Sequence, residues 1–314
     1  MKPTPQPQGL FSRPEVRGII FAFLATLVWS GNFIVSRQLS GQVPPITISV
    51  FRWGTAFLFL IPFAFREMWQ ARAHYWAHKG YYVLVSIIGV SYFNTAIYFA
   101  AHTVPAMNMS LIATSSPLIT LVLGRVFFGD AISPRRLLGV VVVFSGVVYL
   151  ISKGSFAVLA QFSFTPQDLL MLSACLSFAL YTLLLRKKPQ GGTQLGFLAV
   201  TFGLGVVFLL PFYVMEGQQQ GFVVPWSEGL RWQVLYLGLG PSLFSYWAWG
   251  RAVQLAGSAR ASLIYYTIPL FAGVEAALLL GEPLLFVHLV SGALIFGGLL
   301  LATKETAIKK DWGK

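Results

Sequence analysis

The chain has 314 residues, of which 56% are hydrophobic and only 10% charged. Soluble domains carry about 25% charged residues, so this composition excludes a water-soluble globular protein. Ten apolar segments of roughly 20 residues can each cross the ~30 Å hydrocarbon core of a membrane as a helix. The sequence therefore predicts an all-α integral membrane protein with spans at 16–37, 44–65, 80–101, 105–125, 135–152, 168–186, 194–215, 232–251, 260–281 and 283–303.

The chain has a formal net charge of +12, and its basic residues are distributed unevenly between the two sides of the predicted topology. With the N-terminus inside, 18 of the 22 Lys and Arg residues fall on the inner side of the membrane. This asymmetry is the positive-inside pattern and predicts that both termini are cytoplasmic. We therefore expect a lipid bilayer as the partner of the basic residues and no nucleic acid. The single cysteine, Cys175, excludes a disulfide within the chain.

The first span combines small residues with a polar pair. Ala22, Thr26 and Ser30 recur four residues apart, which lets a neighbouring helix approach closely. Trp29 and Asn32 lie beside them in the same span. We expect this helix to line the interior of the bundle.

The segments after the first span add a buried charge and a polar stripe. The second span contains Arg52, and the basic, Trp-rich segment 66–82 that follows predicts an interfacial helix. In the third span, Ser91, Asn94 and Tyr98 share one helical face. Such a stripe is costly in lipid, so it is expected to face the protein interior.

Two prolines lie within predicted spans near the middle of the membrane, Pro117 in the fourth and Pro269 in the ninth. Each removes one backbone hydrogen bond, which would free the carbonyls of Ala113 and Tyr265. These positions could serve as hinges, or as acceptors for an ammonium group of a ligand. An ordinary kink satisfied by water or a serine is the alternative.

The chain repeats itself. A shift of 152 residues superposes apolar stretches that end in an acid, and a shift of 149 aligns Asn32 with Tyr181. We predict two copies, 1–152 and 168–314, joined by an outer linker at 153–167. Because each copy has five spans, the second must be inverted relative to the first, with a site near the midplane between them. The matches at the shift of 152 are Ser110 with Ser262, Leu111 with Leu263, Ile112 with Ile264, Pro117 with Pro269, Gly129 with Gly281, Asp130 with Glu282, Phe144 with Phe296 and Gly146 with Gly298.

These residues resemble a known family. The two proline-to-acid stretches, the glycines Gly146 and Gly298, the WSGNF motif at 29–33 and the PPITISVFRWGTA run at 44–56 are similar to the ten-helix, EamA-like branch of the drug/metabolite transporter superfamily. The resemblance covers nearly the whole chain and is strongest to aromatic amino-acid exporters. It implies an exporter of amino acids and related metabolites in a bacterial cell inner membrane, working by alternating access.

Aromatic and amide side chains in the polar stripes are the candidate substrate-binding residues. Aromatic rings stack on apolar side chains and attract an ammonium by cation–π interaction, although simple helix packing would also explain each ring. The candidates are Trp29, Asn32, Asn94, Tyr98, Tyr181, Tyr246, Tyr265 and Tyr266.

Four acidic or basic residues stand out, and two of them, Arg52 and Glu275, have two interpretations each. Arg52 and Glu275 lie at similar depths below the outer surface, where each charge needs a partner or water. Arg52 could hold a substrate carboxylate and Glu275 a coupling proton, or the two could pair with each other or with backbone. Asp130 and Glu282 each precede a predicted helix and are expected to cap it.

Other functions fit the sequence less well. A cation-expelling multidrug antiporter would be expected to carry an acid in the first span, and none occurs there. An embedded enzyme would need a set of nucleophile and base, but HExxH, GxSxG and paired carboxylates in the loops are missing. No phosphate-binding loop, cofactor or metal site is predicted. Proton coupling and movement of substrate down its own gradient both remain open, and so does the oligomeric state.

Overall fold

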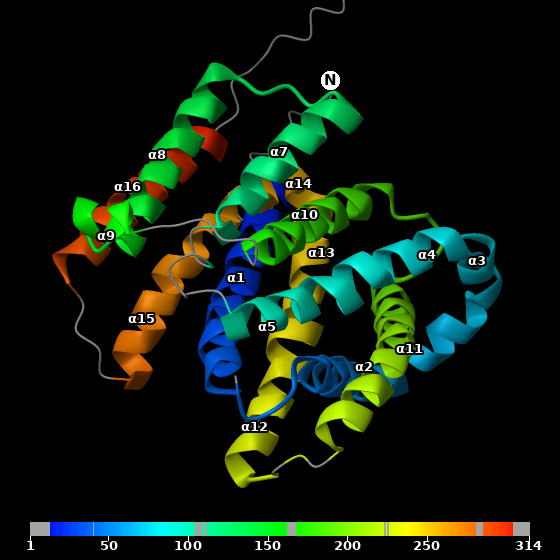
Figure 1. Ribbon diagram of the computed structural model, residues 1–314. Coiled ribbons are helices and arrows are strands. Elements are labelled where there is room, and N and C mark those ends of the chain that lie inside the picture. Colours follow the sequence, from blue (N-terminus) through cyan, green and yellow to red (C-terminus); the bar gives the residue numbers. More distant parts are fainter. Residues whose placement is uncertain are drawn as a thin grey trace, which may run out of the picture.

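The computed structural model describes residues 13–39, 41–103, 109, 112–161, 168–222, 224, 226–280 and 285–303. Every regular element in these ranges is helical (Figure 1), as the composition predicts. Six helical stretches are long and apolar enough to cross a membrane, at Pro45–Gln70, Lys79–His102, Pro134–Ile151, Asp168–Lys187, Gln194–Gln220 and Phe286–Thr303. The count of ten spans and the orientation of the termini remain predictions.

The first half of the chain departs from the predicted spans after the second span. Helix α2 continues to Gln70, so it takes up the start of the predicted interfacial segment, and the short α3 follows. The predicted linker at 153–167 contains the short helix α9. The elements are α1 (Pro14–Leu39), α2 (Pro45–Gln70), α3 (Arg72–Ala77), α4 (Lys79–Ser86), η2 (Ile87–Tyr92), α5 (Phe93–Thr103), α7 (Ser115–Phe128), α8 (Pro134–Ile151) and α9 (Phe156–Ala160).

The second half repeats this order with its own interruptions. Its predicted eighth and ninth spans are each built from several consecutive helical pieces. The elements are α10 (Asp168–Leu184), η3 (Leu185–Lys187), α11 (Gln194–Gln220), α12 (Glu228–Leu237), η4 (Gly238–Phe244), α13 (Ser245–Ala256), α14 (Ser258–Ile264), η5 (Tyr265–Thr267), α15 (Ile268–Leu280) and α16 (Phe286–Thr303).

Both halves contain a π-helical turn at the same place. Segments η2 and η4 begin 151 residues apart, each in the middle of a long helical stretch. A proline, Pro241, lies inside η4 and cannot donate its backbone nitrogen to the helical ladder. Widened turns of this kind leave carbonyl groups free for other donors and occur often at functional sites.

The sequence suggested that Pro117 and Pro269 interrupt the interior of a helix, but in the structure each lies in the first turn of a helix. Pro117 is the third residue of α7 and Pro269 the second residue of α15, and the chain turns just before each of them. Proline is tolerated in a first turn because the N–H it lacks would have no partner there. Before Pro269 the carbonyl oxygen of Ile264 accepts a hydrogen bond of 2.7 Å from the Thr267 hydroxyl.

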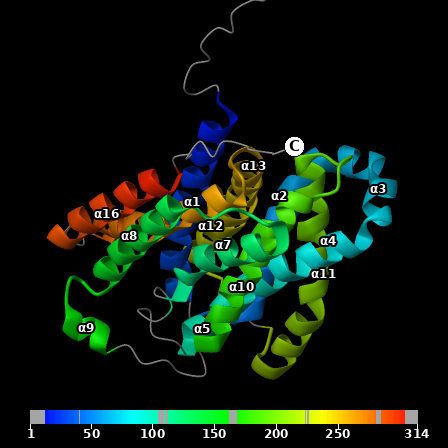
Figure 2. The ribbon, with the colours of Figure 1, turned by 90° about the horizontal axis from the view of Figure 1, so that it is seen from above.

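The helices pack in reciprocal pairs from the two halves. Helix α1 packs against α13 and α15, while α10, the first helix of the second half, packs against α5 and α7. Helices α2 and α11 form one edge of the molecule, and α8 and α16 form another (Figures 1 and 2). A Cβ atom on Gly298 would lie 2.7 Å from the backbone nitrogen of Val143, so glycine permits the close crossing of α16 and α8.

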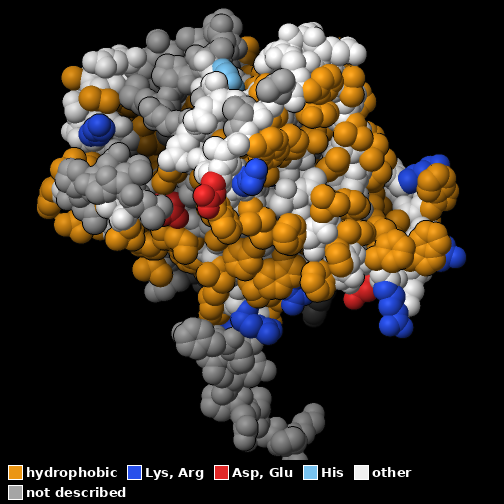
Figure 3. All heavy atoms as spheres, turned by 90° about the horizontal axis from the view of Figure 1, so that it is seen from below, with side chains coloured by type: hydrophobic (Ala, Val, Ile, Leu, Met, Phe, Trp, Pro, Cys, Tyr) orange, Lys and Arg blue, Asp and Glu red, His pale blue; other side chains and the backbone are white. Residues whose placement is uncertain are grey.

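The outer surface is strongly apolar. In Figure 3 hydrophobic side chains cover wide areas of the face in view, and charged groups gather in separate patches. Large apolar side chains point outward from several helices, including Phe63, Leu278 and Leu289. A surface this apolar fits lipid rather than water, which agrees with the predicted membrane location.

Candidate functional site

A group of aromatic side chains fills the centre of the bundle. Rings from α1, α5, α10, α13 and η5 contact one another, and each residue is less than 9% exposed. The ring centroid of Trp29 lies 5.4 Å from that of Phe178 and 5.8 Å from that of Tyr246. Phe178 in turn lies 5.2 Å from Tyr265. We call this group the aromatic cluster; it consists of Trp29, Phe93, Phe178, Tyr181, Tyr246, Trp249 and Tyr265.

Equivalent positions of the two copies meet in this cluster. Trp29 and Phe178 are 149 residues apart, and their rings touch edge to face. Asn94 and Tyr246 are 152 residues apart, and the Asn94 amide donates a hydrogen bond of 3.2 Å to the Tyr246 hydroxyl. Residues related by a repeat touch each other only where the two halves face one another. The aromatic cluster therefore lies between the two halves.

The π-helical turns hold these rings in place. The Tyr246 hydroxyl donates to the carbonyl oxygen of Gly89 in η2 at 2.6 Å. The Trp29 indole donates to the carbonyl oxygen of Pro241 in η4 at 2.8 Å. A Cβ atom on Gly89 would overlap the ring of Tyr181, so this position has room only for glycine. The interruptions in the helices thus position the cluster.

Arg52 lies in a polar network beside the cluster and is 1% exposed. Its Nε donates to the Ser242 hydroxyl at 2.5 Å, and its Nη1 donates to Asn32 Oδ1 and to the Tyr98 hydroxyl, both at 2.9 Å. All three acceptors are neutral. Among the described residues no carboxylate pairs with this guanidinium.

Glu275 occupies a separate position on α15. Its Oε1 accepts a hydrogen bond of 2.8 Å from the Ser30 hydroxyl, and its Oε2 is buried without a partner among the described residues. The similar depth of Arg52 and Glu275 had suggested that they could pair with each other, but the structure does not pair them. The repeat position of Glu275 in the first copy is Leu123, so this acid belongs to one half only.

The structure brings together seven of the eight candidate residues. Trp29, Tyr181, Tyr246 and Tyr265 belong to the aromatic cluster, Asn94 is bonded to it, and Asn32 and Tyr98 bind Arg52. Tyr266 is buried, but its hydroxyl has no partner and its ring meets no other ring in the described part of the chain.

Sequence reasoning missed three members of the cluster. Phe178 could have been found, because the shift of 149 that aligns Asn32 with Tyr181 also aligns Trp29 with Phe178. Trp249 could also have been found, because it lies at helical spacing from Ser245 and Tyr246 in the eighth predicted span. Its indole donates to the Thr182 hydroxyl at 3.1 Å. No signal separates Phe93 from the many phenylalanines that face lipid.

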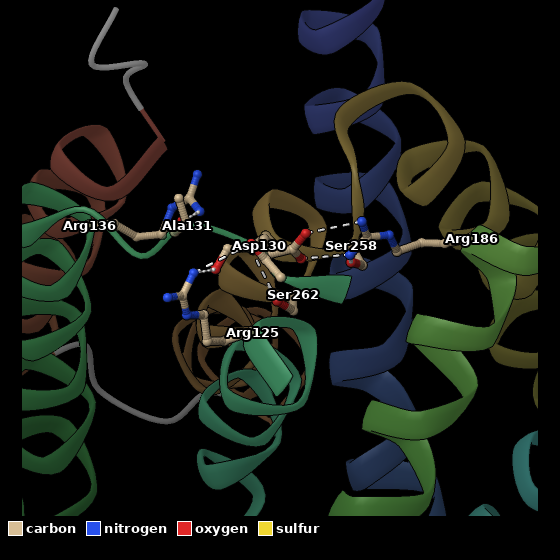
Figure 4. Close-up of polar contacts among 9 residues, drawn as sticks. Arg125, Asp130, Ala131, Arg136, Arg186, Ser258 and Ser262 are labelled. Atoms are coloured by element: carbon tan, nitrogen blue, oxygen red, sulfur yellow. Dashed lines mark hydrogen bonds and ion pairs between the residues drawn. The ribbon is translucent and has the colours of Figure 1, made fainter. Parts of the chain in front are cut away.

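An ion pair joins the two halves near the points where α7 and α10 end. Both oxygens of Asp130 accept from the Arg186 guanidinium, at 2.6 and 3.1 Å (Figure 4). From the sequence, Asp130 was expected to cap the following helix, and this expectation is wrong. The Ser133 hydroxyl caps α8 by accepting a hydrogen bond of 3.2 Å from the backbone nitrogen of Arg136. The equivalent acid, Glu282, lies outside the described residues.

The helical fold, its apolar surface and its long apolar helices define a multi-pass membrane protein. The model of the EamA-like transporter family matches the chain twice, over residues 16–152 and 165–304. The chain belongs to the EamA-like transporter family.

Several transporters and probable exporters are similar to this chain. An uncharacterized transporter of Archaeoglobus fulgidus is 28% identical over 90% of this chain and 96% of its own length. A probable amino-acid metabolite efflux pump of Escherichia coli is 23% identical over 90% of this chain and 93% of its own. A probable terminal-alkyne amino-acid exporter of Streptantibioticus cattleyicolor is 27% identical over 71% of this chain and 72% of its own.

A solved crystal structure shares the fold. It superposes with a TM-score of 0.72 at 17% identity and covers 92% of this chain and 97% of its own. At this identity the likeness concerns the fold alone.

Proposed function

We propose that the chain is an alternating-access exporter of small amphipathic metabolites, in particular amino acids, including aromatic ones. The observation that carries this proposal is the aromatic cluster, in which Trp29 and Phe178, at equivalent positions of the two copies, touch edge to face. Aromatic faces accept an apolar side chain and attract an ammonium group by cation–π interaction. The names of the efflux pump and the alkyne amino-acid exporter support the same substrate class.

In this proposal Arg52 binds the substrate carboxylate. A buried guanidinium bonded only to neutral acceptors lacks a countercharge, and a carboxylate supplies one with bidentate geometry. The Asn32 and Tyr98 side chains hold the guanidinium in place until the substrate arrives. The substrate would then lie with its carboxylate toward Arg52 and its side chain toward the aromatic cluster.

Glu275 is the proposed coupling residue. An acid with one unpartnered oxygen can take up a proton at small structural cost. Pro117 and Pro269 are the proposed hinges, because the chain already turns before each of them.

The proposed topology has ten spans in two inverted five-helix halves, 1–152 and 168–314, with both termini in the cytoplasm of a bacterial cell. Two separate matches to the family model and the reciprocal packing of α1 on α13 and of α10 on α5 support it. The chain would lie in the inner membrane.

Uptake into proteoliposomes tests the function. Labelled phenylalanine, threonine and an organic cation are offered to vesicles that hold the purified full chain, with and without a pH gradient. Transport of the amino acids and not of the cation is expected. Transport of the cation alone would move the protein to the multidrug branch of the family and contradict the proposal.

Glu275→Gln tests the coupling. We expect this variant to lose flux driven by a pH gradient and to keep exchange of labelled for unlabelled substrate, because only the net movement requires a proton to leave. Glu228→Gln is the matched control, because Glu228 lies exposed at the start of α12. Gradient-driven flux that survives in Glu275→Gln would refute the role of this acid.

A further inference from the structure

A polar hollow of about 620 Å³ lies at the inner end of the bundle, outside the aromatic cluster. It is enclosed by the connection from α10 to α11 on one side and by the end of α13 on the other. Arg186, Lys188, Gln190, Gln194, Arg251 and Gln254 line it, and Leu185 and Val253 form its buried floor. We call it the inner pocket. Neither the family nor the central site accounts for it.

The inner pocket carries uncompensated positive charge. The guanidinium of Arg186 is neutralised by Asp130, but Lys188 and Arg251 form no ion pair in the described part of the chain. Burial and the neighbouring Arg251 lower the pKa of the Lys188 ammonium to about 8. Two half-buried cations held near each other without an anion are unfavourable, so the pocket is suited to take up a negative charge.

A hydrogen-bond donor in the same pocket also lacks an acceptor. The Oε1 atom of Gln194 accepts from the Lys188 ammonium at 3.0 Å and from the Gln254 amide at 3.3 Å. This fixes the Gln194 amide so that its Nε2 is the remaining donor, and that atom is buried with no acceptor among the described residues. Leaving a buried donor unpaired is costly. The Nε2 atom packs against Gly250 of α13, so it would reach a carboxylate oxygen in the pocket after a turn of the Gln194 side chain.

The inner pocket lies about one helical turn from the aromatic cluster. Val253 follows Trp249 by four residues on α13, and Leu185 follows Thr182 by three at the end of α10. The hydrogen bond between Trp249 and Thr182 joins these two helices directly beneath the pocket floor. Leu185 and Val253 therefore lie between the inner pocket and the helix positions that carry the cluster.

We propose that the inner pocket is a docking site for the carboxylate of a small organic anion, which Lys188, Arg251 and Gln194 bind before the solute passes to the aromatic cluster. This inference rests on the proposed export function, under which the anion is an amino acid on the cytoplasmic side. A lipid phosphate offers similar charge, but the polar lining provides no apolar groove for acyl chains.

The test uses the full chain in nanodiscs of neutral lipid, with benzoate as the probe because it carries a carboxylate and no ammonium. In the variant with Lys188→Gln and Arg251→Gln, the affinity for benzoate should fall roughly tenfold, as expected for lost charge-assisted hydrogen bonds. The control carries Lys79→Gln and Arg135→Gln, which remove two exposed cations outside the pocket. Equal loss in both variants would show a general effect of charge and overturn the proposal.

The second readout is transport. In the pocket variant the KM for phenylalanine on the inner side should rise about tenfold while kcat is nearly unchanged, because the central site is intact. An unchanged KM in a protein that still transports phenylalanine would overturn the pocket and leave the export function standing. Benzoate binding that depends on Lys188 and Arg251, in a protein that transports no amino acid, would uphold the pocket as an anion site and refute export instead.

Two further outcomes complete the test. Benzoate affinity should fall as the pH rises above about 8, and Lys188→Arg should remove this fall because arginine stays charged. The charged groups facing Lys188 are Arg251 and His74, and His74, whose pKa is lowered, is neutral throughout this window. If benzoate does not bind and, in nanodiscs that contain phosphatidylglycerol, the pocket variant instead loses bound phosphatidylglycerol, the pocket belongs to lipid headgroups and the proposal is wrong.

Discussion

Replacing Gly89 by alanine should destabilise the protein through a single methyl group. The added Cβ would lie 2.7 Å from Cγ of the Tyr181 ring and closer still to its edge. That ring is 1% exposed and is held against Tyr246, with centroids 5.4 Å apart, so it has little room to retreat. Overpacking of this kind costs about 1–3 kcal/mol.

Within a helix alanine is more favourable than glycine by roughly 0.5–1 kcal/mol, and this gain offsets part of the packing cost. The net loss for Gly89→Ala should therefore be about 1 kcal/mol, within a range of roughly 0 to 2.5 kcal/mol. Gly54→Ala provides the matched control, because a Cβ atom at Gly54, inside α2, meets nothing within 4 Å. The control gains the same helix preference and should be neutral or stabilising.

The assay is reversible unfolding in mixed micelles, followed by tryptophan fluorescence. A double-mutant cycle with Tyr181→Leu isolates the clash, since the penalty of Gly89→Ala should shrink when the ring is gone. Gly89→Ala that is as stable as Gly54→Ala, or a penalty that survives Tyr181→Leu, would refute this account of the π-helical turn.

Three other predictions follow from the packing and the ion pair. Gly298→Leu should separate α8 from α16 and lower the unfolding midpoint and the yield. Gly297→Leu is the control, because a Cβ atom at Gly297 meets nothing within 4 Å, and equal effects of the two variants would contradict the prediction. Asp130→Asn should cost less than about 1 kcal/mol, because its pair with Arg186 is partly exposed, and high salt should mask the loss. Trp29→Ala should raise the KM for phenylalanine more than that for threonine, and equal effects would exclude ring stacking.

The sequence by itself determined the class of protein and its internal repeat. Segment length and the scarcity of charge require helices in a membrane, because an unpaired backbone group is costly in lipid. The recurrence of Pro117 at Pro269 and of Gly146 at Gly298 is visible without coordinates. Most of the candidate site was accessible in the same way, since a polar or aromatic residue in an apolar span stands out.

Only the tertiary structure decided which of these residues meet and where the helices break. Periodicity gives the face of a helix but not its neighbour, so it could not show that Arg52 binds Asn32 and Tyr98 rather than Glu275. The π-helical turns depend on carbonyls that find donors on other helices, as Gly89 finds Tyr246. The interruption at η2 is tertiary in origin, because a side chain of another helix satisfies the freed carbonyl. At η4 the sequence contributes as well, since Pro241 cannot donate to the helical ladder.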